Sequence, residues 1–252
     1  MKKFIEKIVI SAVILSMCVV GINTLYVKAE AKCFSDVHKF KNDPEHIEIC
    51  NTGSSHGYNG FCYEDINEES FNFALTSQSL IYDDRILNNY QDSLSDDTIV
   101  FIPVSYFSFY GMAEDLQPDF ESKNQRYYHF LPKDLIMDYT EKDAFYAKFP
   151  ALKDNEMLAK IIYHPASYSQ DMGRERTTSA ERVAAIASDR AESHVGAIVR
   201  DANGKLIINK EYCDALTDMI ELCQRRGCRV ILITTPFLHD YRGSNRMWTS
   251  TT

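Results

Sequence analysis

The sequence contains no concentrated positive charge beyond its first few residues. Its net charge is −9, with 27 lysines and arginines against 36 aspartates and glutamates. Binding to nucleic-acid phosphates needs clustered positive charge, so this composition argues against nucleic acid as a partner. The contents of 45% hydrophobic and 25% charged residues are ordinary for a globular protein. A chain of 252 residues is long enough for one sizeable domain with an insertion.

Motifs for binding metals and nucleotides are also missing. The seven cysteines form no C-x-x-C pair, and no two histidines have the spacing of zinc ligands, so no metal site is predicted. Cys50 lies in a strand-like run and Cys223 on the apolar face of a helix, and both are expected to be buried free thiols. The glycine-rich stretch 51–60 has neither the G-x-G-x-x-G intervals of a dinucleotide-binding loop nor the Gly-Lys-Ser/Thr of a phosphate-binding loop.

The longest apolar run lies at the N-terminus. No charged residue occurs from Ile8 to Val27, and three lysines precede this stretch. A helix of this length rises about 30 Å, the thickness of the hydrocarbon layer of a membrane. Lysines before the helix favour a cytoplasmic tip, so residues 1–27 are predicted to be a single-pass anchor of the cell membrane, with the rest of the chain extracellular. The alternative is a secreted chain, cleaved near Ala31.

The rest of the chain alternates between strand-like and helical segments. Residues 28–45 are polar and are expected to form a linker, followed by one domain over residues 46–252. Strands are predicted at 46–50, 70–75, 98–105 and 228–236. Helices are predicted at 76–94 and from Asn209, which can cap a helix that ends before Gly227. This alternation predicts an α/β fold, a flavodoxin-like three-layer sandwich around a central parallel sheet.

Residues 106–208 interrupt the alternation. The segment is polar and contains prolines, with helices predicted near 141–149 and 179–192. A hairpin is predicted over 197–208, because Asn203-Gly204 is a strong turn signal. We expect the whole segment to be an insertion that covers one end of the sheet.

The stretch ICNTGSSHGYNGF, residues 49–61, follows the first predicted strand directly. Ligands of open parallel sheets bind beyond the carboxyl ends of the strands, where this loop would lie. A serine in the first turn of a helix offers its backbone N–H to a developing oxyanion. Gly53 is expected to permit a tight turn, and Gly57 to let a substrate approach the backbone. A polar turn without function is the alternative, since glycine, serine and asparagine are ordinary turn residues.

The segment NTGSSHG resembles the opening block of the SGNH (GDSL-like) hydrolase superfamily, in the variant found in membrane-anchored cell-surface proteins. FNFALTSQSLIYDDRIL, TIVFIPVSYFSF and CRVILITTP resemble later elements of that variant, so the similarity covers about residues 46–110 and 205–240. The resemblance implies that Ser55 is the nucleophile and that Gly53, Ser54, Asn72 and Ser105 bind the substrate or the oxyanion. It further implies an exported esterase or O-acyltransferase acting on an acylated glycan or cell-wall polymer, without metal or organic cofactor.

Two features depart from the family's pattern. Ser105 stands where the family has its oxyanion asparagine, and the Asp-x-x-His that supplies the general base does not occur after residue 236. We therefore interpret the chain as a C-terminally shortened member with impaired catalysis. Three histidines are candidates for a replacement base. His239, which follows a strand at the appropriate edge, is the first and His56 is the second, whereas the third, His194, is expected to pack or to face solvent. The alternative function is an inactive surface protein of the same fold that binds glycans or assists assembly.

Overall fold

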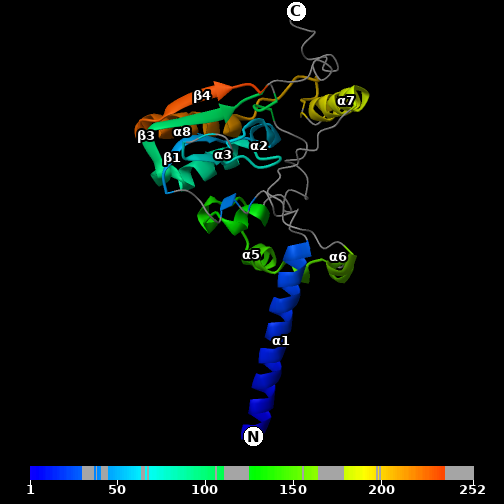
Figure 1. Cartoon of the computed structure of the whole chain (residues 1–252). Helices are drawn as coiled ribbons and strands as arrows, with labels where there is room; N and C mark the ends of the chain where they lie inside the picture. Colours follow the sequence, from blue (N-terminus) through cyan, green and yellow to red (C-terminus); the bar gives the residue numbers. More distant parts are fainter. Residues whose placement is uncertain are drawn as a thin grey trace, which may run out of the picture. The chain divides into compact units, whose positions relative to one another are not determined.

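A computed structural model of the chain describes residues 1–29, 37, 39–40, 45–63, 66, 68–105, 107–110, 125–154, 156–163, 179–196, 198 and 200–235 (Figure 1). The chain divides into two compact units. The first consists of residues 1–41 and 124–172, and the second of residues 42–123 and 173–252. The segment 106–208, which was expected to be one insertion, is thus divided between the two units.

The second unit contains, within its described residues, a four-stranded parallel sheet of order β2-β1-β3-β4. The strands are β1 (Ile47–Asn51), β2 (Ser70–Asn72), β3 (Leu94–Pro103) and β4 (Arg229–Ile233). They confirm the α/β class and the parallel sheet, although β2 is shorter than predicted and β3 begins earlier. Cys50 of β1 pairs with Val100 of β3, and both side chains are fully buried.

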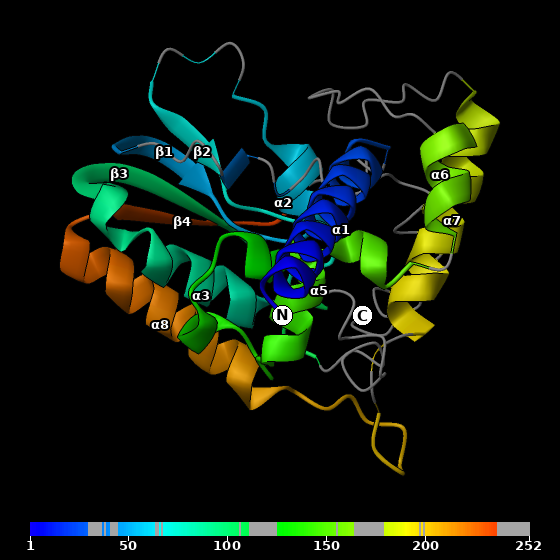
Figure 2. The same ribbon diagram turned by 90° about the horizontal axis from the view of Figure 1, so that it is seen from below.

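Helices α3 (Leu80–Asn89) and α8 (Lys210–Arg226) lie side by side on one face of the sheet (Figure 2). The predicted ends of α8 are confirmed, because the Asn209 side chain accepts a hydrogen bond from the N–H of Glu211 and Gly227 adopts a left-handed φ of 80°. Burial of each large apolar side chain of α8 contributes about 1.5 to 3 kcal/mol. The buried residues of α8 are Tyr212, Ala215, Met219, Leu222 and Cys223. Cys50 and Cys223 are buried free thiols, as predicted.

Helix α3 begins four residues later than predicted. Ser77 has a left-handed φ of 55°, which interrupts the helical pattern that the sequence shows from residue 76 onward. Ser79 is the N-cap instead, and its side chain accepts a hydrogen bond from the N–H of Tyr82. The turn between β2 and α3 therefore reaches further along the chain than its helical pattern indicates.

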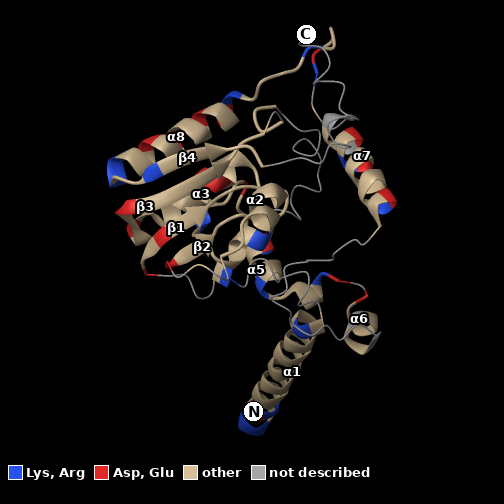
Figure 3. Cartoon of the chain, turned by 45° about the horizontal axis from the view of Figure 1, so that its top comes forward, with Lys and Arg blue, Asp and Glu red and all other residues tan. Residues whose placement is uncertain are grey.

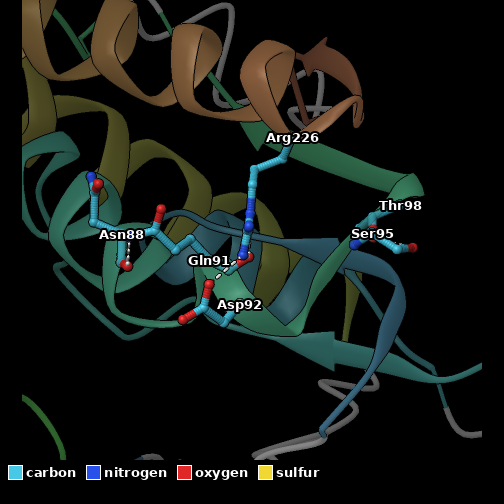
Figure 4. A network of polar contacts seen from close by, with 6 residues as sticks. All are labelled: Asn88, Gln91, Asp92, Ser95, Thr98 and Arg226. Atoms are coloured by element: carbon cyan, nitrogen blue, oxygen red, sulfur yellow. Dashed lines mark hydrogen bonds and ion pairs between the residues drawn. The ribbon is translucent and has the colours of Figure 1, made fainter.

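The C-terminal end of α8 is bound to the connection between α3 and β3. Arg226 Nε donates to the carbonyl oxygen of Gln91 at 2.8 Å, and its Nη2 lies 2.5 Å from Asp92 Oδ1 (Figure 4). Gln91 and Asp92 belong to the short helix η2 (Gln91–Ser93). The sequence predicts that basic residues complement the dipole at this helix end, and Arg226 also uses its charge in a direct contact between segments far apart in the chain.

Helix α7 (Ala180–Gly196) and the turn after it also belong to the second unit. The helix confirms the prediction near 179–192. The turn at Asn203-Gly204 is present, with Gly204 at a φ of 78° and the N–H of Asp201 donating to the carbonyl of Lys205 at 2.9 Å. Among the described residues of the predicted hairpin, an antiparallel bridge joins Arg200 and Leu206 on either side of this turn.

The first unit contains α1 (Lys2–Ala29), η4 (Gln125–His129), η5 (Lys133–Leu135), α5 (Glu141–Lys148), η6 (Pro150–Leu152) and α6 (Met157–Tyr163). Helix α1 is long and apolar enough to cross a membrane, and its charged residues lie toward its ends (Figure 3). Helix α5 confirms the prediction near 141–149. Part of the expected linker is packed in this unit, since Phe40 is buried and its ring centroid lies 3.8 Å from that of Phe130.

Candidate functional site

The predicted nucleophile loop lies at the carboxyl edge of the parallel sheet. Strand β1 ends at Asn51, and helix α2 (Ser55–Gly60) begins four residues later with Ser54 as its N-cap. Gly53 has a φ of +116°, a conformation that favours glycine, and a Cβ there would lie 3.1 Å from Pro103 Cγ. Gly53 therefore supplies the tight turn. Ser54 and Ser55 are half-buried, and the Ser54 side chain makes no capping hydrogen bond.

A buried aspartate holds this turn in place. The N–H of Gly53 donates to Asp83 Oδ1 at 2.7 Å, and Gln78 Nε2 donates to the same oxygen at 2.6 Å. Asp83 lies in the first turn of α3 and is only 2% exposed. Burial raises the pKa of Asp83 to about 7, although both hydrogen bonds act in the opposite direction. Because the N–H of Gly53 is bound to Asp83, it is not available to a substrate oxyanion.

We expect the Asp83→Asn variant to show a weaker pH dependence of stability between about pH 4 and pH 7. The pKa of Asp83 is raised from its ordinary 3.8 to about 7, so the folded state binds more protons than the unfolded state in this window. The wild-type free energy of unfolding therefore falls as the pH rises through it. Asparagine keeps an oxygen acceptor for Gly53 but does not ionise. Urea unfolding at several pH values measures the difference.

Asp84→Asn is the matched control for this prediction. Burial and, to a smaller extent, the nearby Asp218 raise the pKa of Asp84 to about 6, but no hydrogen bond joins Asp84 to the loop in the described structure. We expect a smaller flattening of the pH profile from this variant. An unchanged profile in Asp83→Asn, with flattening only in Asp84→Asn, would contradict the role given to Asp83.

Two asparagines attach α2 to the end of the sheet. Asn51 Nδ2 donates to Asn72 Oδ1 at 3.1 Å, and Asn51 Oδ1 accepts from the hydroxyl of Tyr63 at 2.9 Å. Asn72 Nδ2 lies 3.3 Å from the carbonyl oxygens of both Gly57 and Tyr58 in α2. A side-chain amide has two N–H donors, and those of Asn72 point at α2. The predicted oxyanion role of Asn72 would therefore require these bonds to break.

Gly57 serves the packing of α2 rather than the approach of a substrate. It is buried, and a Cβ at this position would lie 2.3 Å from the carbonyl oxygen of Thr52 and 3.0 Å from Ala74 Cβ. The missing side chain lets α2 lie directly against the residue that follows β1. The expected role of Gly57 in exposing backbone to a substrate is wrong, because the space beside its Cα is filled by the protein itself.

His56, the residue that follows Ser55 in the chain, belongs to a cluster of aromatic rings. His56 of α2 has its ring centroid 5.9 Å from that of His194 of α7 and 5.5 Å from that of Phe107. The rings of Phe107 and His194 are 5.0 Å apart. Burial and, to a smaller extent, the neighbouring His194 lower the pKa of His56 to about 4, so its imidazole is neutral at neutral pH. The structure thus brings together two of the three histidines proposed as bases.

The ends of the other strands meet at the same edge. Ser105 follows β3 and is buried, and its N–H donates to Ser108 Oγ at 2.9 Å in a tight turn. Thr235 follows β4 and lies close to α2. Its Cγ2 would be 3.5 Å from a Cβ added to Gly60. The side-chain oxygens of Thr52 and Thr235 are buried without a hydrogen-bond partner among the described residues. His239 lies outside the described residues, so its predicted role as a base stays a prediction.

Several residues of this site do not stand out in the sequence. Asp83 belongs to an ordinary pair of acidic residues in a helix, and Asn51 is a common residue at a turn. Their roles arise from contacts with residues that are distant in the sequence. Among the described residues, no group of three or more histidine, cysteine, aspartate or glutamate side chains is arranged to hold a metal ion.

Comparison of the chain with family models, with curated proteins and with solved structures yields no match. The resemblance to the SGNH superfamily therefore depends on the motifs quoted above.

Proposed function

We propose that the chain is a membrane-anchored, exported serine esterase or O-acyltransferase of the SGNH type, acting on acyl esters of a cell-surface glycan. One observation carries the proposal: Ser55 begins a helix at the carboxyl edge of a parallel sheet, after a left-handed glycine and directly before His56, whose ring lies against that of His194. The strand order β2-β1-β3-β4 also agrees with the first four strands of a flavodoxin-like sheet.

In this mechanism Ser55 Oγ attacks the ester carbonyl and an imidazole accepts its proton. The acyl group forms an ester with Ser55, and the departing alcohol takes the proton from the imidazole. Water or a sugar hydroxyl then attacks the acyl-enzyme and releases the acid or the new ester. Of the expected oxyanion donors, the backbone N–H of Ser55 is the one we propose, with the hydroxyl of Ser105 as the second.

His194 is the proposed base of this reaction. Consecutive residues of a helix point in directions about 100° apart, so His56 and Ser55 do not face each other. His194 comes from α7, and its ring lies against the ring of His56, the residue that follows Ser55 in the chain. With a pKa lowered to about 4, the half-buried His56 is a weak base, and we assign it the role of supporting the His194 ring.

Helix α1 supports the membrane part of the proposal. Its length and composition suit a single crossing of a bilayer. Lysines at its start favour a cytoplasmic N-terminus, and the sheet unit is then extracellular. Cleavage near Ala31 is the alternative, in which the same domain is released outside the cell.

A fluorophosphonate probe tests the nucleophile. The full chain in membranes is expected to be labelled, and peptide mass spectrometry should locate the adduct on Ser55. Ser55→Ala should abolish the labelling, whereas the matched Ser54→Ala variant should retain it. Equal labelling of the two variants would refute the assignment of Ser55.

A catalytically inactive protein that binds surface glycans is the second candidate function. It is favoured by the engagement of two expected oxyanion donors in the fold, because the Gly53 N–H is bound to Asp83 and the Asn72 amide to α2. Ester hydrolysis by the full chain above the rate of Ser55→Ala would exclude this candidate.

A further inference from the structure

The last turns of α1 are hydrogen-bonded to polar groups of other segments of the first unit. Asn23 Nδ2 donates to the carbonyl oxygen of Lys148 at 3.1 Å, and Asn23 Oδ1 accepts from the N–H of Ala151 at 3.3 Å. The Tyr26 hydroxyl donates to Asp154 Oδ2 at 2.7 Å. These partners carry polar and charged groups that do not belong in hydrocarbon. The lipid-embedded part of α1 therefore ends before Asn23.

The uncharged segment from Ile8 to Ile22 can still cross a membrane. At 1.5 Å per residue it rises roughly 22 Å, less than the thickness of about 30 Å of a hydrocarbon core. Local thinning of the bilayer, and extension of the lysine side chains before Ile8 to the headgroups, accommodate a difference of this kind. The membrane surface then lies at the level of Asn23. This is four residues before Val27, where the uncharged run in the sequence ends. The residues bound to Asn23 must lie at that surface.

Four large apolar side chains of the same unit are exposed close to this level. Phe145 belongs to α5 and Leu152 to η6, with exposed fractions of 50% and 49%. Leu158 and Ile162 of α6 are exposed by 62% and 65% and, four residues apart, share one face of that helix. Both η6 and α6 contact α1, and Figure 1 shows α5 and α6 beside its C-terminal end. We call these four residues the apolar collar.

We propose that the apolar collar inserts into the lipid surface of the membrane that α1 crosses. Membrane lipid is the proposed partner because the apolar collar is continuous with the exposed apolar surface of α1. The two surfaces meet at the level of Asn23, where the membrane surface is placed. Short apolar faces of this kind insert into the boundary between headgroups and acyl chains, to a depth of about 5 to 10 Å. The collar thus holds the first unit against the bilayer. This inference rests on the anchoring part of the proposed function and not on its hydrolase part.

Tryptophan fluorescence in vesicles tests the proposal with the full chain. Trp248→Phe first removes the sole native tryptophan. Leu158→Trp and Ile162→Trp then place a reporter on the collar, and Glu156→Trp, at an exposed polar position at the start of α6, is the matched control. Each protein is reconstituted into phosphatidylcholine vesicles with or without bromine on the acyl chains. We expect bromine to quench the two collar reporters at least about twofold more than the control.

Each outcome has a distinct meaning. Quenching of the collar reporters no stronger than that of the control overturns the proposal. Blue-shifted collar emission that is insensitive to bromine also overturns it, and indicates contact with a second copy of the chain. Release of the protein by sodium carbonate overturns both the collar and the anchor, whereas retention without quenching overturns the collar alone. The hydrolase part is tested separately by labelling of Ser55.

Discussion

Replacing His194 with glutamine is expected to lower the rate of ester hydrolysis by roughly 10²- to 10⁴-fold, the usual contribution of a general base. The proposal places the transferred proton on this ring, and a glutamine amide cannot accept it at neutral pH. The wild-type rate should also fall on the acid side, because a protonated imidazole is no longer a base. The steady-state rate with a small aryl ester, measured on the full chain across the pH range, gives both quantities.

His56→Gln is the matched control, since the rings of His56 and His194 contact each other and both lie near the ring of Phe107. Burial and the neighbouring His194 together lower the pKa of His56 to about 4, so this ring is a weak base and contributes mainly by packing against His194 and Phe107. We expect a loss of less than about tenfold, with the acid limb of the pH profile retained. A larger loss in His56→Gln than in His194→Gln would assign the proton to His56. Full activity in both variants would return the role to His239.

The predictions that the structure confirms come from local signals. Helix α8 was predicted with its N-cap Asn209 and the glycine at its end, because capping residues act within one turn of the positions they mark. The near-continuous apolar runs at 98–105 and 228–236 predicted β3 and β4, because such runs are typical of parallel strands. Gly53 was predicted as a turn residue from its position directly after β1. Each of these features is decided by a few neighbouring residues.

The features that the sequence analysis missed depend on contacts between distant segments. Asp83 lies 30 residues from Gly53, to which it is hydrogen-bonded, and nothing in the pattern of α3 distinguishes it from Asp84. His194 was expected to pack or to face solvent, because it lies in the segment 106–208 that was predicted to be an insertion. Its ring lies instead beside the residue that follows Ser55. Such juxtapositions are set by tertiary packing, which periodicity and capping do not encode.

Gly57 shows how the same limit applies to a glycine. In the sequence it looked like an exposed turn residue, yet its hydrogen atoms occupy space bounded by Thr52 and Ala74. The space is tight because Asn51 and Asn72 both hold the carbonyl of Gly57. The sequence alone does not distinguish a glycine required by close packing from one required by its backbone conformation. The residues around it in the folded structure make the distinction.

Replacing Gly57 with alanine is therefore expected to destabilise the sheet unit by about 3 kcal/mol. Alanine normally favours a helix over glycine by about 1 kcal/mol, so a simple propensity argument predicts the opposite sign. The new Cβ would lie 2.3 Å from the Thr52 carbonyl oxygen, a backbone atom that can move only with β1. Helix α2 must shift away from the sheet, and this shift breaks the hydrogen bonds from the two asparagines. Urea unfolding of the full chain measures the loss.

Gly60→Ala provides the control within the same helix. A Cβ at Gly60 would lie 3.5 Å from Thr235 Cγ2, an ordinary van der Waals contact, so its stability should change by less than about 1 kcal/mol. The shift of α2 in Gly57→Ala also displaces Ser55, and fluorophosphonate labelling of this variant should slow even under conditions where it is fully folded. Equal unfolding midpoints for the two variants would show that α2 is not held against β1, and the placement of Ser55 at the sheet edge would then lose its physical basis.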